Sequence, residues 1–197
     1  MGDVRSDSDA ELMKKVAQED LIAFSELLKR YQSPLFNFNY RYLGNYDEAQ
    51  DLTQEVFLRI YTSAKKYKPL AKFTTYLFKI ARNLCLNKLK KRRFWLFSLD
   101  EPEKSAEIPA SDSTRPDVIC EKEETIASVR KALSSLGENQ RTAVILQRFY
   151  NLSYEEIAEV MECSVSAVES LLFRAKQNLK KRLSFQNSVT KEKGINY

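Results

Sequence analysis

Apolar residues recur at spacings of three and four along most of the chain, and glycine and proline are rare between them. This is the period of an amphipathic α-helix, and the runs of β-branched residues that would indicate strands are absent from the sequence. The pattern therefore predicts an all-α fold. Four helices are expected in the first half: one capped by Asp20, one restarting at Ser33-Pro34 and ending at Gly44, one from Asp47 to before Pro69, and one from Thr74 or Thr75 to Arg93.

The helical pattern breaks in the middle of the chain. Residues 98–116 (SLDEPEKSAEIPASDSTRP) contain three prolines, four serines and an excess of acidic residues, with no apolar period. So long a structureless stretch is uncommon inside a compact domain, which favours a flexible acidic linker over a surface loop. We therefore expect two small helical domains, residues 8–95 and 123–184, joined by a linker over residues 96–122.

The second half returns to the helical period near Val118, and the pattern breaks again at Gly137. Ser153 and Glu156 have the spacing of a capping box, which predicts a helix over residues 154–161. Ser164 can cap a last helix that reaches about Leu183. Two helices joined by so short a turn are typical of a helix-turn-helix, although an antiparallel pair in a plain bundle has the same pattern.

The last helix has an apolar face made by Val165, Val168, Leu172, Ala175 and Leu179. In a helix-turn-helix, the opposite face of such a helix enters the DNA major groove, where serine, glutamate and arginine can contact base edges. Lysines further along this helix can contact phosphates. The candidate DNA-binding residues are Ser164, Ser166, Ala167, Glu169, Ser170, Phe173, Arg174 and Lys176.

Charge is segregated along the chain. The net formal charge is +5, but residues 61–93 contain eleven Lys and Arg and no Asp or Glu, residues 100–124 sum to −6, and residues 164–183 sum to +4. Nucleic-acid binders segregate charge in this way, whereas an ordinary solvated surface intersperses it.

The first basic block combines cations with aromatic and amide side chains. The loop KKYKPLAKF precedes a helix whose polar residues recur on one face, and this combination suits single-stranded DNA, because bases stack on aromatic rings. An amide such as that of Asn83 can hold an extruded base. The candidates here are Lys66, Lys68, Lys72, Phe73, Tyr76, Lys79, Arg82, Asn83, Asn87 and Lys90.

The residue types present argue against an enzyme. The chain has no histidine and no glycine-rich phosphate loop, and its three cysteines form no CxxC pair. This removes the usual general base, the histidine-assisted nucleophiles and the common zinc sites, so we expect no enzymatic activity, no metal and no cofactor. No apolar run is long enough to span a bilayer and no signal core is present, so we expect a cytoplasmic protein without membrane insertion.

A third segment, DLTQEVFLRIY at residues 51–61, is an amphipathic helix. Leu52, Val56, Phe57 and Ile60 can face inward, while the outer side is an acidic and amide stripe with one apolar position. By its pattern alone it is an ordinary surface helix that could also dock a partner.

The order of these segments resembles the extracytoplasmic-function group of bacterial RNA polymerase sigma factors. AFSELLKRYQSPLFNF with DLTQEVFLRIY is similar to the first conserved part of the N-terminal sigma domain, and FTTYLFKIARNLCLNKLKKRR to its promoter-melting helix. LGENQRTAVILQRFYNLSYEEIAEVMECSVSAVESLLFRAKQNLKKRL is similar to the domain that contacts the minus-thirty-five element. The resemblance covers residues 10–183 and implies a sigma factor that directs promoter-specific initiation.

The resemblance also implies roles for particular residues. The clamp helices of the largest polymerase subunit are expected to bind Asp51, Gln54, Glu55, Phe57 and Leu58. Lys79, Arg82, Asn83 and Asn87 are expected at the minus-ten strand, residues 166–176 in the minus-thirty-five groove, and an anti-sigma protein as a further partner. The sequence departs from common family residues at Tyr76, Asn87, Gly137, Glu169 and Phe173, which leaves the preferred DNA sequence open.

Two other classes remain at this point. A helix-turn-helix repressor or activator would bind DNA without polymerase, usually as a dimer on a palindromic site, but no dimerisation helix is visible and the upstream basic block would have no role. A nucleic-acid enzyme would need carboxylate, histidine or metal clusters that the sequence does not contain.

Overall fold

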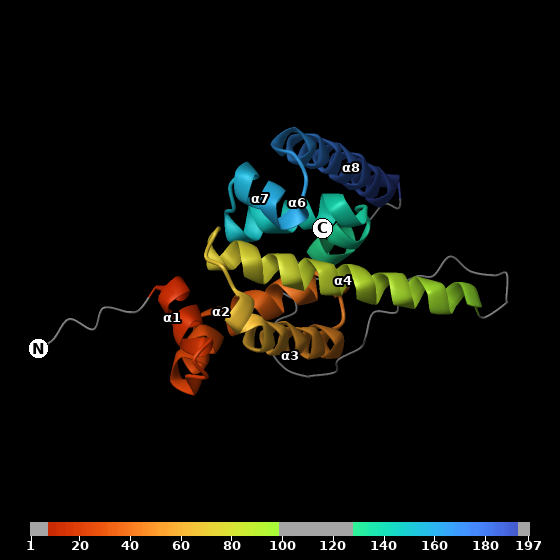
Figure 1. Cartoon of the computed structure of the whole chain (residues 1–197). Helices are drawn as coiled ribbons and strands as arrows, with labels where there is room; N and C mark the ends of the chain where they lie inside the picture. Colours follow the sequence, from red (N-terminus) through yellow and green to blue (C-terminus); the bar gives the residue numbers. More distant parts are fainter. Residues whose placement is uncertain (1–7, 99–127, 193–197) are drawn as a thin grey trace, which may run out of the picture. The chain divides into compact units, whose positions relative to one another are not determined.

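Helices form all of the regular structure in residues 8–98 and 128–192, which are the residues that the computed structural model describes (Figure 1). The chain divides into two units, Met1–Ala110 and Ser111–Tyr197. Unit 1 contains α1 (Asp9–Val16), α2 (Leu21–Leu43), α3 (Tyr46–Ser63), the 3-10 turn η1 (Ala64–Lys66) and α4 (Phe73–Ser98). Unit 2 contains a helix over residues 128–134, α6 (Glu138–Tyr150), α7 (Tyr154–Met161) and α8 (Val165–Glu192).

The predicted ends of α2 are confirmed, but the predicted break inside it is wrong. Asp20 accepts hydrogen bonds from the backbone N–H groups of Ile22 at 2.8 Å and Ala23 at 3.0 Å. Gly44 ends the helix in the left-handed region at φ 77°, where glycine has no steric penalty. Between them α2 continues through Pro34. Burial of apolar side chains both before and after the proline offsets the hydrogen bond that its ring removes.

The predicted starts of the next two helices are displaced by one or two residues. Asn45, not Asp47, caps α3, and its side chain accepts the N–H of Glu48 at 2.9 Å. The helix ends before Pro69, as predicted. At α4 the backbone carbonyl of Lys72 accepts the N–H of Thr75 at 3.0 Å, so the helix begins at Phe73.

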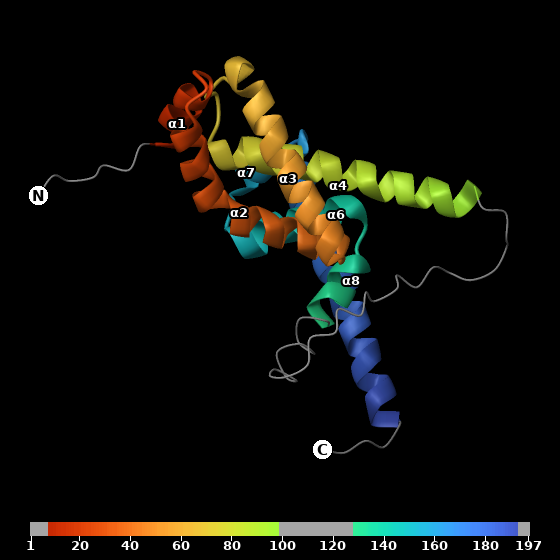
Figure 2. The same cartoon turned by 90° about the horizontal axis from the view of Figure 1, so that it is seen from below.

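α4 is longer than the pattern indicated. It continues past Arg93 to Ser98, so residues 96–98 of the predicted linker are helical. Its last turns extend beyond α2 and α3 in both views (Figures 1 and 2), and Phe94 and Trp95 are exposed there. The rest of the predicted linker, residues 99–122, and the predicted helical residues 118–127 lie outside the described residues.

α1 was not predicted from the sequence. Its start is a complete capping box, in which the Ser8 hydroxyl accepts the N–H of Glu11 and the Glu11 carboxylate accepts the N–H of Ser8 at 2.8 Å. Leu12, Met13 and Val16 are buried, and α1 packs against both α2 and η1. The signal was in the sequence as Ser-x-x-Glu followed by an apolar i, i+1, i+4 pattern.

The core of unit 1 lies where α2, α3 and α4 meet. Leu27, Phe38, Val56, Ile60 and Leu77 are fully buried there. A polar contact also lies in this core: the amide of Asn39 donates to the Thr53 hydroxyl at 3.0 Å, and the Cys85 thiol lies 3.5 Å from the Asn39 carbonyl oxygen. These three residues come from α2, α3 and α4, so the network fixes the three helices relative to one another.

In unit 2 the core is formed by α6, α7 and α8, with Ile145, Leu146, Ile157 and Val168 fully buried. The predicted capping box of α7 is confirmed. α8 runs to Glu192 instead of ending near Leu183. No helix in the described part of the chain is long and apolar enough to cross a membrane.

Arg141 holds the helix over residues 128–134 to α6. Arg141 is 8% exposed. Its guanidinium donates to the carbonyl oxygens of Leu133 at 3.0 Å, Ser134 at 2.8 Å and Leu136 at 3.3 Å. Carbonyl groups at a helix C-terminus have no partner inside the helix and carry partial negative charge, so a buried cation is favourable there.

Candidate functional surfaces

The predicted strand-binding residues form one surface on unit 1, here called the basic surface: the loop of residues 67–72 with its preceding turn, and the polar face of α4. Most of its predicted members are exposed or half-buried. The exposed ones are Lys66, Lys68, Lys72, Asn83, Asn87 and Lys90, and the half-buried ones are Tyr76, Lys79 and Arg82. On the opposite side of α4, Leu77 and Ala81 are fully buried, so the helix is anchored by one face and presents the other.

Phe73 does not belong to the exposed part of this surface. It is 4% exposed and its ring packs 5.0 Å from that of Tyr31 and 6.5 Å from those of Tyr67 and Tyr76. The prediction that Phe73 contacts DNA is therefore corrected, because its ring is part of the aromatic packing below the loop. Its position between two lysine-rich segments had suggested exposure, and only the tertiary contacts reveal the burial.

Carboxylates from the turn after α1 and from α3 reach part of the basic block. Glu19 lies 2.8 Å from the ammonium of Lys65, and this hydrogen bond lowers the pKa of Glu19 and raises that of Lys65. Glu48 lies 3.6 Å from Lys88. Lys65 and Lys88 therefore have carboxylate partners elsewhere in unit 1, although residues 61–93 themselves contain no acidic residue.

A second group of predicted residues forms a stripe on the outer side of α3, here called the α3 stripe: Asp51, Gln54, Glu55 and Leu58. Asp51, Gln54 and Leu58 are exposed, Leu58 by 62%. Glu55 is half-buried and accepts from Arg59 at 2.6 Å. Phe57 was predicted in the same group but is 4% exposed and packs edge-on to Phe24, so its predicted direct contact with a partner is corrected to a core role.

The α3 stripe adjoins a pocket that the sequence did not predict. The pocket has a volume of about 420 Å³ and lies between α2 and α3. It is lined by Lys29, Gln32, Ser33, Phe36, Tyr46, Gln50, Thr53 and Gln54. The contribution of α2 was missed because its polar residues at i, i+3 and i+4 resemble any solvated helix face, and only packing brings them beside Gln54.

The third group lies on unit 2, in the helix-turn-helix formed by α7 and α8. The turn begins at Glu162 in the left-handed conformation at φ 55°, and the N–H of Cys163 donates to the carbonyl of Ala158 at 3.1 Å. Ser164 then accepts the N–H of Ala167 at 3.2 Å, which starts α8 as predicted. Val168 and Ala175 on the inner face are fully buried.

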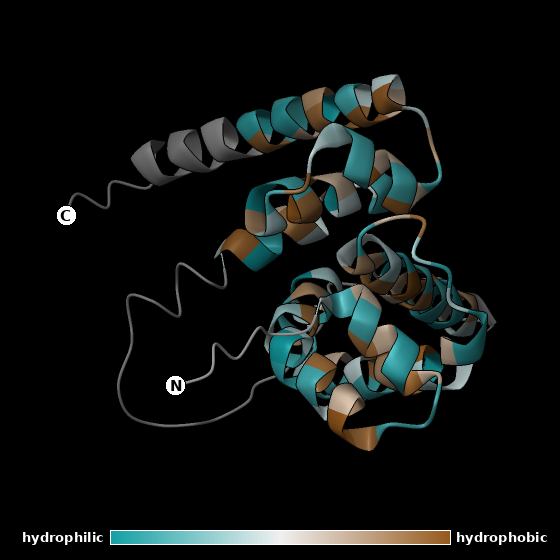
Figure 3. Cartoon of the chain, turned by 60° about the vertical axis from the view of Figure 1, so that its left-hand side comes forward, coloured by the Kyte–Doolittle hydropathy of each residue, from teal (hydrophilic) through white to brown (hydrophobic). Residues whose placement is uncertain are grey.

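The outer face of α8, here called the recognition face, carries the predicted groove-contacting residues. Ser164, Ser166, Glu169, Ser170, Phe173, Arg174 and Lys176 are exposed, and Ala167 is half-buried. Phe173 is 64% exposed, so its ring lies on the outside of α8. Hydrophobic and hydrophilic residues alternate along this helix (Figure 3).

Family models match both parts of the chain. Residues 27–94 match Sigma-70 region 2, and residues 126–179 match Sigma-70 region 4. The RNA polymerase sigma-H factor of Pseudomonas aeruginosa is 32% identical over 182 residues, covering 90% of this chain and 94% of that protein. The ECF RNA polymerase sigma-E factor of Escherichia coli K12 is 32% identical over 175 residues, covering 86% of this chain and 91% of that protein.

Solved structures agree on the fold. CnrH in complex with the cytosolic domain of CnrY has a TM-score of 0.67 at 22% identity, covering 90% of this chain and 98% of that one. RpoE in complex with the anti-sigma factor NepR from Bartonella quintana has a TM-score of 0.64 at 24% identity, covering 82% and 96%.

The regions and the relatives together define a sigma-70-type specificity subunit. The chain belongs to the extracytoplasmic-function (ECF) group of RNA polymerase sigma factors. It binds core RNA polymerase and promoter DNA, directs promoter-specific initiation through regions 2 and 4, and is not an enzyme.

Proposed function

We propose that the basic surface handles the minus-ten strand during promoter opening, within an N-terminal sigma domain at residues 8–95. The supporting observation is the row of exposed and half-buried polar side chains on α4 beside the cationic loop. Lys79, Asn83, Asn87 and Lys90 follow one another by four, four and three residues on the side opposite the buried Leu77. Lysines attract the strand backbone, and the Asn83 amide holds an unstacked base.

The recognition face contacts the minus-thirty-five element, within a C-terminal domain at residues 123–184. Arg174 and Glu169 are exposed on α8 and have the donors and acceptors that distinguish base pairs in the major groove. Lys176 contacts phosphate, and Phe173 provides an apolar contact. Unit 1 therefore handles the minus-ten strand, and unit 2 contacts the minus-thirty-five duplex.

The α3 stripe binds the clamp helices of the largest polymerase subunit. Gln54 supports this assignment best, because it is exposed on α3 and also lines the pocket between α2 and α3. A side chain from the polymerase can enter this pocket while Asp51 and Leu58 make contacts beside it. A polar pocket next to an exposed leucine provides both specificity and buried apolar area.

An anti-sigma protein is the proposed inhibitor, and the cytoplasm is the proposed location. Two solved structures of the same fold are complexes with a cytosolic domain or an anti-sigma factor. Leu21 and Ile22 on α2 and Leu58 on α3 are exposed apolar residues that such a partner can cover. Co-purification from the native host, followed by competition with core polymerase, tests whether a bound protein is this inhibitor. We expect core polymerase and the inhibitor to displace each other. A bound protein that core does not displace and that leaves transcription unchanged would contradict the inhibitor role.

Site-specific photocrosslinking tests the division between the two DNA surfaces. A photoreactive residue is placed in holoenzyme at Asn87 or at Ser170, both exposed. We expect Asn87 to crosslink to the nontemplate strand of the minus-ten element and Ser170 to the minus-thirty-five duplex. A probe at Ser25, which is exposed on α2 and belongs to neither surface, is the control. Exchange of the two crosslinking patterns, or crosslinks equal to those of the control, would contradict the proposal.

The docking role is tested by a double substitution. Gln54→Ala with Glu55→Ala removes two polar groups of the α3 stripe without opening the core, so we expect weaker core binding with unchanged helical content. Lys14→Ala with Gln18→Ala is the matched control, since both residues are exposed on the same unit. Equal retention of core polymerase by the two double variants would remove the α3 stripe from the interface.

A further inference from the structure

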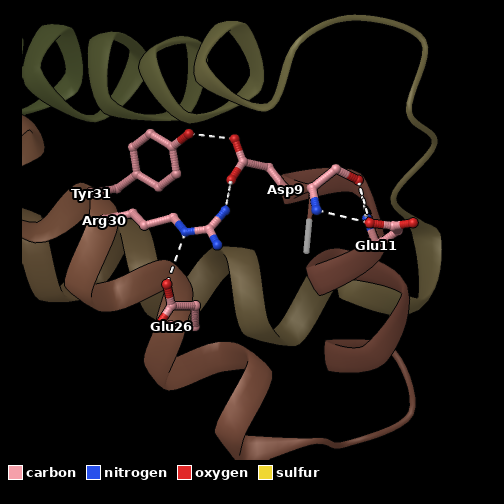
Figure 4. A network of polar contacts seen from close by, with 6 residues as sticks. Asp9, Glu11, Glu26, Arg30 and Tyr31 are labelled. Carbon is pink, nitrogen blue, oxygen red and sulfur yellow. Dashed lines mark hydrogen bonds and ion pairs between the residues drawn. The ribbon is translucent and has the colours of Figure 1, made fainter. Parts of the chain in front are cut away.

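A charged and aromatic cluster connects α1 to the loop of the basic surface. One oxygen of the Asp9 carboxylate, Oδ1, accepts from Nη1 of Arg30 at 3.0 Å, and the other, Oδ2, accepts from the hydroxyl of Tyr31 (Figure 4). Glu26 holds the guanidinium from its other side, with Nε of Arg30 to Oε1 of Glu26 at 3.0 Å. The Asp9 carboxylate therefore has two donors, both from α2. α1 lies ahead of the residues 27–94 that match region 2.

The position of Asp9 is set by α1 itself. Asp9 is the first residue of the helix, directly after the capping box of Ser8 and Glu11. Leu12 and Met13 are buried one turn further along, so the start of the helix cannot turn away from α2 without exposing them. The carboxylate is thus presented by a packed helix and not by a mobile end.

From Tyr31 the contacts continue through aromatic rings. The Tyr31 ring lies 5.0 Å from that of Phe73, the first residue of α4. Tyr67, at the start of the loop, lies 6.5 Å from the Phe73 ring and 5.2 Å from the Tyr76 ring. The Tyr76 hydroxyl forms a hydrogen bond of 2.7 Å with the hydroxyl of Ser63 at the end of α3. Offset and edge-on ring pairs at these distances are favourable and directional.

Two tyrosine hydroxyls lie near the Asp9 carboxylate. Burial raises the pKa of Tyr31, and its hydrogen bond to Asp9 raises it further, so the hydroxyl stays protonated and donates. Burial also raises the pKa of Tyr67, with the negative charge of Asp9 as the next cause. The Tyr67 hydroxyl is buried and finds no hydrogen-bond partner among the described residues. Ring packing, together with the backbone hydrogen bond from the N–H of Tyr67 to the carbonyl of Ala64 at 3.1 Å, holds the start of the loop.

We propose that Asp9 is a positioning residue for strand opening: through Tyr31 and Phe73 it sets the position of residues 67–72 and of the first turn of α4. The proposal rests on the proposed role of the basic surface at the minus-ten strand. Lys68 and Lys72 are exposed on this loop, and Tyr76 lies half-buried at its end. A displacement of about 1 Å, even from a change remote from the reacting groups, can reduce a rate by up to about 100-fold.

The test measures the rate of open-complex formation by holoenzyme, with 2-aminopurine in the minus-ten element reporting unstacking. Asp9→Ala removes both contacts, while Tyr31→Phe removes one hydroxyl and keeps the ring on Phe73. We expect Asp9→Ala to slow opening about three- to tenfold and Tyr31→Phe to slow it less, with core affinity and closed-complex binding unchanged. Because the two residues act in one series of contacts, the double variant should open no more slowly than Asp9→Ala alone.

Two controls separate positioning from stability. Lys14→Ala removes an exposed charge from the same helix as Asp9, outside the basic surface, and should leave opening unchanged. Ile60→Val truncates a fully buried core residue of α3 and should lower the melting temperature without slowing opening. If Asp9→Ala lowers core binding, closed-complex binding and opening in parallel with its melting temperature, or if its effect simply adds to that of Tyr31→Phe, the positioning role is overturned.

Asn83→Ala in the same assay distinguishes the positioning role of Asp9 from the proposed function of the basic surface. Slow opening by Asn83→Ala with normal opening by Asp9→Ala would overturn the positioning role and leave the proposed function of the basic surface standing. Normal opening by Asn83→Ala would contradict the proposed function, and the positioning role with it.

Discussion

The two proposed DNA surfaces are built in different ways. The recognition face belongs to a single helix, α8, whose exposed residues follow from the buried Val168 and Ala175 on its other side. The basic surface combines a loop with one face of α4, and residues of α1, α2 and α3 support it from below. The contacts of Tyr31 with Phe73 and of Ser63 with Tyr76 are examples of this support.

The difference matches the two tasks. The major groove of duplex DNA admits one α-helix, so a correctly capped helix with the right outer face is sufficient to contact base edges. An unstacked base needs a surface that surrounds it with cations, rings and amides, and one helix cannot provide all of these. The recognition face should therefore tolerate changes elsewhere in its unit, whereas the basic surface should depend on neighbours that never contact DNA.

The largest effect is expected for Arg141→Ala in unit 2. It leaves the carbonyl groups of residues 133, 134 and 136 without their buried donor, so we expect a loss of roughly 2–4 kcal/mol in the free energy of unfolding. The order of preference among promoter variants should not change, because the recognition face is local. Urea denaturation measures the loss of stability, and binding to promoter variants measures the order of preference. Arg148→Ala, an exposed change on the same helix, is the control, and equal destabilisation by both would contradict the role of Arg141.

A smaller loss of stability with a larger loss of function is expected for Tyr76→Phe in unit 1. The substitution removes the hydrogen bond to Ser63 and should cost about 1 kcal/mol of stability. Opening should slow even so, because the start of α4 is then less firmly fixed to α3. Tyr61→Phe is the control. Wild-type opening by Tyr76→Phe would show that the basic surface does not depend on the hydrogen bond from its Tyr76 to Ser63 of α3.

The smallest effect is a gain. Gly137 caps α6 without a side-chain hydrogen bond, its φ of −58° suits any L-residue, and a Cβ there would meet nothing within 4 Å. Gly137→Ser should therefore stabilise unit 2 by roughly a few tenths of a kcal/mol through an N-cap hydrogen bond. Thermal melting measures the gain, and binding to promoter variants should stay unchanged. An altered base preference would mean that the recognition face is less local than proposed.

The same distinction explains which features could be predicted from the sequence. Caps such as Asp20, Ser153 and Ser164, and the two faces of α8, depend on residues within four positions of one another, so the sequence pattern predicts them. The burial of Phe57 and Phe73 depends on rings of α2, which are distant in sequence. It also depends on the tyrosines around the loop, whose direction the spacing alone does not determine. The pocket beside Gln54 likewise needs α2 and α3 to be packed together. Pro34 shows the converse, a local signal for a helix break that long-range burial overrides.

Paired promoter templates test whether unit 1 opens the strands while unit 2 selects the duplex. Asn83→Ala and Arg174→Ala holoenzymes are compared in transcription from a duplex promoter and from the same promoter with mismatches across the minus-ten region. Both residues are exposed, so melting temperatures should stay close to wild type and confirm that the variants are folded.

Asn83→Ala should be slow on the duplex and largely restored on the mismatched template, because the cost of unstacking has already been removed. Arg174→Ala should be weakened on both templates alike, by about 1–3 kcal/mol of base-contact energy. An equal defect of Asn83→Ala on the two templates, or restoration of Arg174→Ala by the mismatches, would contradict the assignment of opening to unit 1 and duplex selection to unit 2.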